Sequence, residues 1–251
     1  MILVADIGNT NIVVGIYKQK WQYIWRFTTD KQASIHDYSL KINNALWEAG
    51  IDPKDIVSKV LSSVVPELKD LFVTLLTNLS SSQLIVLDKN IYAKLPIVIP
   101  NKNEIGTDLV ANVMAAHHLH KENLIIVDFG TALTFTAVDK FGNIKGINIA
   151  PGIKTAINAL EDKASQLDMV PLVFPKNVLG HNTVEAIQNG VLIGYVGLVS
   201  HMILVIKQDL GQDYKVLATG GLSTILLDRL PVINYVEPNL TIDGLLLIAD
   251  V

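Results

Sequence analysis

The chain has 251 residues, and 50% of them are hydrophobic, which is enough to bury a sizeable core and suits two domains of moderate size. Its 24 acidic and 20 basic residues give a formal charge of −4, and no run of Lys or Arg stands out, so nucleic acid is not an expected partner. Because the chain has no cysteine, disulfides, thiolate nucleophiles and zinc–thiolate sites are excluded.

The chain begins with two apolar runs, 2–5 and 12–17, that flank a polar turn with the sequence Asp6-Ile7-Gly8-Asn9-Thr10-Asn11. This pattern predicts a β-hairpin. The backbone N–H groups of such a turn can surround a phosphate, and Asp6 can hold a divalent cation that carries phosphate oxygens. Taken alone, the stretch fits an ordinary hairpin with a polar turn equally well. No basic segment precedes the first run, so we expect no secretory signal and a cytoplasmic location.

The remainder of the first half alternates strands and helices. Hydrophobic spacing predicts a third strand at 21–28 and further strands at 60–64 and 84–87. Helices are predicted at 34–49, 66–79 and 107–120, and an irregular loop at 90–105 precedes the last of them. The loop delivers Gly106-Thr107-Asp108 to the start of the last helix. Thr107 or Asp108 could serve there simply as a helix cap, which these residue types do often.

The second half repeats this plan. An apolar run at 124–127 leads into Asp128-Phe129-Gly130-Thr131 and a β-rich run at 133–138, about half the chain away from the first such turn. Further strands are predicted from 144 and at 216–218, with helices from about 151, from 183 to 208, after Gly221 and after Thr241. We therefore interpret the chain as a duplication in which two phosphate loops face each other across a cleft.

Two strand-to-helix turns in this half end in glycine, Ala150-Pro151-Gly152 and Thr219-Gly220-Gly221. Such turns bring free N–H groups close to a ligand and suit a nucleotide, although ordinary tight turns look the same. The apolar stretch 191–206 is shorter than the roughly 20 residues that span a bilayer. Gly190, Gly194 and Gly197 lie at helical spacing there, so we predict a buried or subunit-interface helix and no membrane association.

Five motifs, in order, resemble those of the type III pantothenate kinases, within the superfamily of acetate and sugar kinases, actin and the heat-shock chaperones. They are Asp6–Thr10, Gly106–Asp108, Asp128–Thr131, Ala150–Gly152, and Gly180–Thr183 followed by Ala186, Ile187 and Gly190. The resemblance implies an α/β fold of two duplicated ribonuclease-H-like, actin-like ATPase domains, with mixed sheets flanked by helices and a cleft between them. We expect the domains to cover 1–116 and 117–251, the second including a dimer helix.

The same resemblance implies ATP-dependent phosphorylation of pantothenate to 4'-phosphopantothenate, the first step of coenzyme A biosynthesis, by a homodimer that uses Mg²⁺ or another divalent cation and K⁺ or NH₄⁺. The ATP phosphates would be cradled by Asp6, Ile7, Gly8, Asn9, Thr10, Asn11, Ile12 and Val13 and touched by Thr131. Asp6 would position Mg²⁺, Asp128 would bind the monovalent cation, and Asp108 would accept the proton of the attacking hydroxyl. The pantothenate site would be lined by Gly106, Thr107, Asp108, Leu109 and Thr183.

Two positions depart from the family pattern on the acceptor side. Leu109 stands where the family often has Arg, and Ile99 stands where a Tyr is common. Because of these departures, a kinase of the same fold that acts on another small hydroxyl compound remains an alternative. A catalytically silent nucleotide-binding regulator is a further alternative, although the presence of all three acids argues against it. No Walker-type loop occurs, so positive charge at the phosphates is expected to come largely from cations.

Overall fold

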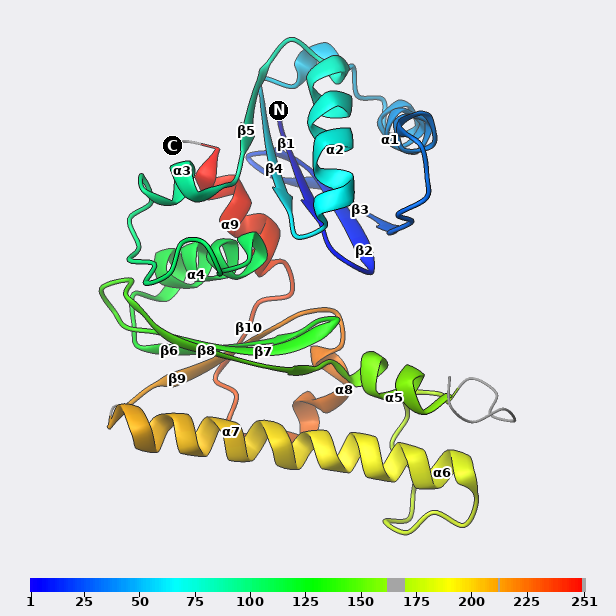
Figure 1. The fold of residues 1–251 in the computed structure, drawn as a ribbon, viewed down its shortest axis with the longest axis vertical. Helices are drawn as coiled ribbons and strands as arrows, with labels where there is room; N and C mark the ends of the chain where they lie inside the picture. The colour runs from blue at the N-terminus through cyan, green and yellow to red at the C-terminus, as the bar shows by residue number, and fades with distance from the viewer. Residues whose placement is uncertain (162–169, 212, 250–251) are drawn as a thin grey trace. The chain divides into compact units, whose positions relative to one another are not determined.

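The computed structural model describes residues 1–161, 170–211 and 213–249. The chain divides into two compact units. The first contains residues 1–119 together with the C-terminal helix, and the second contains residues 120–239. Each unit is built on a five-stranded sheet with helices packed on it (Figure 1).

The first unit has a mixed sheet in the order β3-β2-β1-β4-β5. β1, β2 and β3 form an antiparallel meander, and β4 and β5 run parallel to β1. The strands are β1 (Ile2–Ile7), β2 (Asn11–Lys18), β3 (Lys20–Thr28), β4 (Ser58–Ser63) and β5 (Gln83–Val86). The helices are α1 (Ile35–Glu48), a 3₁₀ turn (Pro53–Asp55), α2 (Pro66–Leu79), α3 (Lys89–Tyr92), α4 (Thr107–His120) and α9 (Leu240–Ile248).

Local sequence explains the ends of these helices. At the start of α1, the Ser34 hydroxyl accepts the Asp37 N–H while the Asp37 carboxylate accepts the Ser34 N–H, which is a capping box. α2 begins with Pro66, whose missing N–H is no loss in a first turn. The last carbonyls of α2 are satisfied by a fully buried cation, since Lys59 Nζ on β4 donates to Leu76 O (2.8 Å) and Ser80 O (2.6 Å).

The second unit repeats the strand order of the first, as β8-β7-β6-β9-β10. β6, β7 and β8 are antiparallel neighbours, and β9 and β10 continue the sheet in parallel. The strands are β6 (Leu124–Phe129), β7 (Ala132–Val138), β8 (Ile144–Pro151), β9 (Lys215–Thr219) and β10 (Tyr235–Val236). The helices are α5 (Ile153–Glu161), α6 (Thr183–Gln188), a π-helical turn (Asn189–Ile193), α7 (Gly194–Leu210), α8 (Ser223–Leu226) and a 3₁₀ turn (Leu227–Arg229). The matching topologies confirm two duplicated ribonuclease-H-like domains.

Each unit has its own apolar core. In the first unit, side chains of β1, β2 and β4 pack against α1 and α2. The ring centroids of Tyr38 and Phe72 are 4.9 Å apart in this core. In the second, β6 and β7 pack against α7, which runs along the sheet in Figure 1. Burial of continuous apolar runs in the central strands is what the mixed sheets require.

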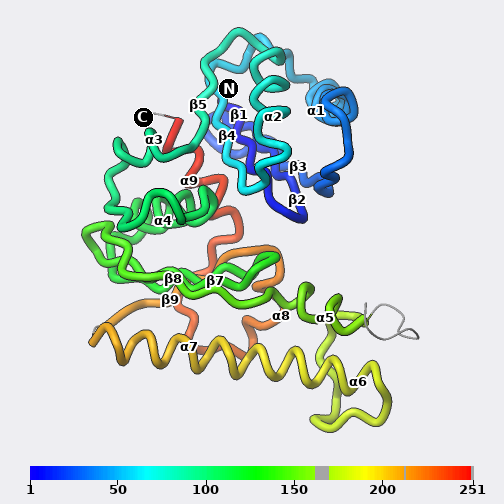
Figure 2. The backbone as a smooth tube through the Cα atoms, in the orientation of Figure 1, coloured from blue at the N-terminus to red at the C-terminus, as the bar shows by residue number. Residues whose placement is uncertain are grey.

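The C-terminal helix corrects the expected division into 1–116 and 117–251. α9 packs against β1 and β4 of the first sheet, and the tube in Figure 2 shows this last segment beside the first strands of the chain. Trp21 Nε1 donates to Asp243 Oδ1 (2.7 Å) and Thr241 Oγ1 donates to Asn112 Oδ1 (2.8 Å), which fix α9 to β3 and α4. Three short elements were also unpredicted, namely the 3₁₀ turn at Pro53–Asp55, α3 inside the expected loop and the two-residue strand β10.

The apolar stretch predicted at 191–206 belongs to a continuous helical segment, 183–210, formed by α6, the π-helical turn and α7. Among the described residues this is one helix long and apolar enough to cross a membrane, but core helices of globular proteins pass the same test. Its inner face carries Tyr195, Val199 and Ile203, all buried in the core of the second unit. Packing on the sheet therefore explains the apolar residues of the inner face, whereas Ile193 and Leu204 on the outer face are exposed.

Candidate functional site

The first polar turn closes the hairpin between β1 and β2. Gly8 N–H donates to Asn11 O (3.0 Å), and Asp6 lies opposite Val13 in the ladder. Of the residues predicted to cradle phosphate, Asn9, Thr10 and Asn11 are exposed at the tip. The side chains of Ile7 and Ile12 are fully buried in the core, so these two residues can offer a ligand only their backbone.

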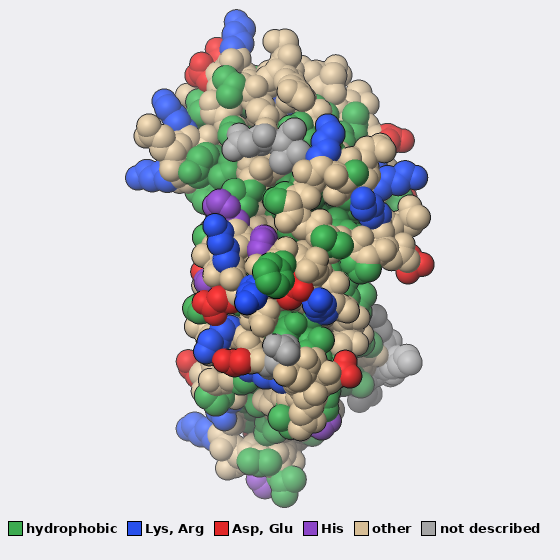
Figure 3. Space-filling view, turned by 90° about the vertical axis from the view of Figure 1, so that its left-hand side faces the viewer, with side chains coloured by type: hydrophobic (Ala, Val, Ile, Leu, Met, Phe, Trp, Pro, Cys, Tyr) green, Lys and Arg blue, Asp and Glu red, His purple; other side chains and the backbone are tan. Residues whose placement is uncertain are grey.

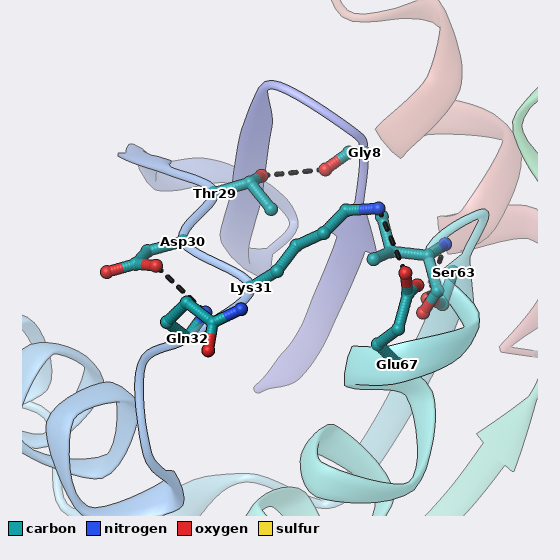
Figure 4. A network of polar contacts seen from close by, with 8 residues as sticks. Gly8, Thr29, Asp30, Lys31, Gln32, Ser63 and Glu67 are labelled. Atoms are coloured by element: carbon teal, nitrogen blue, oxygen red, sulfur yellow. Dashed lines mark hydrogen bonds and ion pairs between the residues drawn. The ribbon is translucent and has the colours of Figure 1, made fainter.

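The segment that follows β3 holds this turn in place. Thr29 donates through Oγ1 to Gly8 O (2.7 Å) and through its N–H to Thr10 O (2.9 Å). Figure 4 shows Lys31 reaching from this segment to the first turn of α2, where its Nζ pairs with Glu67 Oε1 at 3.1 Å. Both partners are about half exposed, so the pair contributes little to stability, but it brings a cation to this end of the sheet.

A chain of hydroxyl groups links Asp6 to the helix that carries Asp108. Ser62, at the end of β4, lies beside Asp6 in the parallel ladder, and its hydroxyl donates to Asp6 Oδ1 (2.7 Å). The Ser62 Oγ is also 2.9 Å from the Oγ1 of Thr107, the first residue of α4. The first unit thus brings the predicted phosphate turn and the predicted base to the same end of its sheet.

The environment of Asp108 favours its protonated form more than water does. Burial raises the pKa of the Asp108 carboxyl, and the hydrogen bond that Oδ1 accepts from the Leu109 N–H (2.8 Å) acts in the opposite direction. Asp108 Oδ1 folds back over Gly106, where a β-carbon would lie 2.5 Å from it. A carboxylate with a raised pKa at a helix start is suited to accept a proton.

The two positions that depart from the family pattern are both buried. Leu109 is 8% exposed and Ile99 is 5% exposed. Neither offers a charge or hydroxyl to an acceptor. If pantothenate binds beside Asp108, its carboxylate must find a partner at another position.

The second polar turn repeats the arrangement of the first. Asp128, near the end of β6, lies opposite Thr134 on β7 and beside Thr219 on β9, in the register that Asp6 has with Val13 and Ser62. Within the described residues, Thr134 Oγ1 is a buried atom with no hydrogen-bond partner. Gly220, at φ +89°, passes so close that a β-carbon there would lie 2.5 Å from Asp128 Oδ1.

These residues fit a monovalent cation. K⁺ is a hard ion that takes oxygen ligands, and the row across β7, β6 and β9 offers the Asp128 carboxylate and the Thr134 and Thr219 hydroxyls. A buried hydroxyl oxygen without a partner costs free energy unless a ligand or water satisfies it. No group of three or more His, Asp or Glu side chains suited to a metal occurs in the part of the chain that the structure describes. A divalent ion would therefore rest on few carboxylates, with water and phosphate completing its shell, as Mg²⁺ does with nucleotides.

Thr131 and Thr183 both lie in the second unit. Thr131 is exposed on the turn between β6 and β7, and its carbonyl accepts the Gly152 N–H (2.9 Å) and the Thr155 hydroxyl (2.7 Å), which ties the turn to the start of α5. Thr183 is the exposed first residue of α6. Asn182 caps that helix, because its side chain accepts the Glu185 N–H at 2.9 Å.

Comparison with known proteins decides the family. Residues 2–204 match the type III pantothenate kinase family. A type III pantothenate kinase from Syntrophotalea carbinolica is 39% identical over 246 residues, which cover 98% of this chain and 96% of that protein. The chain belongs to the type III pantothenate kinase family. It is accordingly a kinase of coenzyme A biosynthesis that phosphorylates pantothenate with ATP.

Solved structures with low sequence identity share the fold of this kinase. A putative Baf family transcriptional activator from Campylobacter jejuni superposes with a TM-score of 0.59 at 18% identity, covering 99% of this chain and 97% of that one. The activator of 2-hydroxyisocaproyl-CoA dehydratase from Clostridium difficile, with bound ADPNP, gives 0.57 at 12% identity, covering 98% and 93%. At these identities the likeness concerns the architecture alone.

Three polar side chains that the sequence did not single out lie near predicted site residues of this kinase. Ser62 lies beside Asp6, Thr134 lies beside Asp128, and Lys31 lies next to the turn between β1 and β2. For Thr134 a signal existed, because β6 and β7 form a hairpin whose register pairs it with Asp128. For Ser62 there was none, because β4 pairs with β1 in parallel and no hairpin fixes that register. Lys31 carried no such signal, because it follows the strand in an irregular segment.

Proposed function

We propose that this kinase transfers the terminal phosphoryl group of ATP to pantothenate with Asp108 as the base and the Asp6–Val13 turn as the phosphate cradle. The observation that carries this assignment is the hydrogen-bonded series Asp6, Ser62 and Thr107, which ends one residue before Asp108. In the reaction, the pantothenate hydroxyl oxygen forms a bond to the γ-phosphorus, the bond from that phosphorus to the ADP oxygen breaks, and the hydroxyl proton moves to Asp108.

Phosphoryl transfer asks a protein mainly for alignment and for charge to meet the equatorial oxygens. The backbone N–H groups of the first turn are neutral donors of this kind. Asp6 would hold Mg²⁺, and Asp128 with the Thr134 hydroxyl would hold K⁺ or NH₄⁺; the cations supply the positive charge that balances the phosphates. Thr131 would contact the nucleotide phosphates, and Gly106, Leu109 and Thr183 would line the acceptor.

A monovalent cation is expected to raise the rate. With Mg²⁺ and ionic strength held constant, we expect turnover in K⁺ or NH₄⁺ to exceed turnover in tetramethylammonium by about tenfold or more, because a large organic ion cannot enter a site built from one carboxylate and hydroxyl oxygens. Initial rates of ADP formation measure this. Equal rates in K⁺ and tetramethylammonium would contradict the role of Asp128, and an Asp128→Asn variant should lose most of the K⁺ response.

A second candidate substrate class is another small hydroxyl compound. The observation that favours it is that Leu109 and Ile99 are buried and offer no charge or hydroxyl to the pantothenate carboxylate. Loss of a charge-assisted pair costs about 1.5–3 kcal/mol of binding when nothing replaces it. Purified enzyme should be offered ATP with pantothenate and, in parallel, with a panel of hydroxy acids and their uncharged alcohol analogues. We expect pantothenate to give the highest kcat/KM for ADP formation. A higher value for another compound would reassign the acceptor.

We further propose that the enzyme is a cytoplasmic homodimer. The outer face of the 183–210 helix supports the homodimer, because Gly190, Ile193, Gly194, Gly197 and Leu204 are exposed along it. Small residues at this spacing allow a second helix to approach closely. Because Ile193 and Leu204 are apolar, burial of this face in a subunit interface would also remove apolar surface from water.

A further inference from the structure

The end of β4 carries two adjacent serines whose side chains do different things. Ser62 is fully buried, and its Oγ lies 2.7 Å from Asp6 Oδ1 and 2.9 Å from Thr107 Oγ1. Ser63 points to the other face of the strand and bonds locally, with its hydroxyl donating to Val65 O at 3.1 Å. Successive residues of a strand face opposite sides, so the chain itself provides a matched pair of hydroxyl groups, one at the site and one beside it.

The direction of these hydrogen bonds follows from the number of protons. A serine hydroxyl has one proton, and an ionised carboxylate can only accept, so the Ser62 proton is committed to Asp6. Thr107 must then donate its proton to Ser62 Oγ. Each member of such a series polarises the next, which strengthens the bond to the carboxylate. The series therefore sets which way the Asp6 carboxylate and the Thr107 side chain point.

We propose that Ser62 is a positioning residue of the phosphoryl transfer. It holds Asp6 in the orientation that receives Mg²⁺. It also fixes the first turn of α4, so that Asp108 keeps its position relative to the Asp6–Val13 turn. This inference rests on the proposed roles of Asp6 and Asp108. Ser62 touches neither substrate in this scheme. It acts through Asp6 and Thr107, and its full burial keeps water from taking the place of the hydroxyl.

The first test replaces Ser62 by Ala and Ser63 by Ala in separate variants of the full-length enzyme. For Ser62→Ala we expect kcat to fall about tenfold to a hundredfold, as for small displacements of reacting groups, with the KM for pantothenate changed less than threefold. The Mg²⁺ concentration for half-maximal rate should rise severalfold. Ser63→Ala should keep kcat within about twofold. Equal kinetics for the two variants would overturn the proposal.

A second arm separates positioning from general loss of structure. Thr107→Val removes the hydroxyl and keeps the shape, whereas Thr107→Ser keeps the hydroxyl. If the series acts as one unit, Ser62→Ala and Thr107→Val together should lower kcat little more than either alone, and Thr107→Ser should retain most of kcat. Strictly multiplicative effects of the two substitutions would show that the hydroxyls act separately and would overturn the proposal.

The third arm does not depend on turnover. Binding of a non-hydrolysable ATP analogue is measured by calorimetry with and without Mg²⁺. Ser62→Ala should weaken binding about fivefold or more with Mg²⁺ and leave metal-free binding unchanged, and an unchanged Mg²⁺ effect would overturn the proposal. If the wild-type enzyme bound Mg²⁺ and the analogue but did not phosphorylate pantothenate, the proposed acceptor would be wrong. The binding measurement would still test the role of Ser62, because it does not depend on the acceptor.

Discussion

Replacing Asp108 by Asn is expected to lower kcat by about 10²–10⁴-fold while nucleotide affinity stays within about twofold. The amide keeps the size of the side chain and can still accept the Leu109 N–H, but it cannot take the proton of the attacking hydroxyl. Because burial disfavours the charged carboxylate, the substitution should leave the melting temperature unchanged or slightly higher. Rates of ADP formation, analogue binding and thermal unfolding are the three measurements.

The control for this variant is Glu104→Gln, which removes an exposed carboxylate from the loop before α4 and should keep nearly full activity. The pH dependence offers an independent check. The base must be ionised to act, and burial raises the pKa of Asp108 above its ordinary value near 3.8, so wild-type kcat/KM should decline on the acid side with a midpoint above that value. The residual activity of Asp108→Asn should lack this decline. A fully active Asp108→Asn enzyme would remove Asp108 from the role of base.

Replacing Gly244 by Ala is expected to cause the largest loss of stability. α9 crosses α4 so closely that a β-carbon at Gly244 would overlap the Ala111 carbonyl oxygen and lie 2.9 Å from Ala111 Cα. Both are backbone atoms, so one helix must move, and overpacking of this kind costs about 3 kcal/mol or more. For a chain of this size, that corresponds to a fall in melting temperature of about 6–12 °C.

The matched control is Gly146→Ala, since no atom lies within 4 Å of a β-carbon placed at that strand position. This variant should unfold at the wild-type temperature or slightly above it, because Ala loses less chain entropy than Gly. A melting temperature of Gly244→Ala within 2 °C of wild type would show that α4 and α9 do not pack this closely. Since α4 also carries Asp108, we expect kcat of the soluble variant to fall as well.

Much of the fold could be predicted because its central strands are continuous apolar runs, and because α1 and α6 carry side-chain caps and α2 starts with proline. The elements that were missed, namely the 3₁₀ turn at Pro53–Asp55, α3 and β10, have three, four and two residues, too few to show a period. The position of α9 could not be predicted for a different reason. An apolar helix carries no local mark of which sheet it covers, so its return to the first unit is decided by packing and by long-range bonds such as that from Trp21 to Asp243.

The site divides in the same way. The two Asp-bearing turns could be predicted, since turn residues and strand ends are local signals. Asp108 was singled out by the family resemblance, because its place at a helix start fits a cap as well. The Ser62 bridge depends on a pairing between residues 56 positions apart, which only the register of β1 and β4 determines. The raised pKa of Asp108 likewise comes from its burial in the folded chain, which has no local mark in the sequence.

The place of α9 in the chain has a consequence for synthesis on the ribosome. Residues 120–239 emerge as one uninterrupted segment, whereas the first unit obtains α9 only from residues made after the whole second unit. Until then, apolar side chains of β1 and β4 lack their cover. We therefore expect the part of the first unit that precedes residue 120 to reach its native packing only after residues 240–248 are made, and its uncovered apolar surface to be open to aggregation until then.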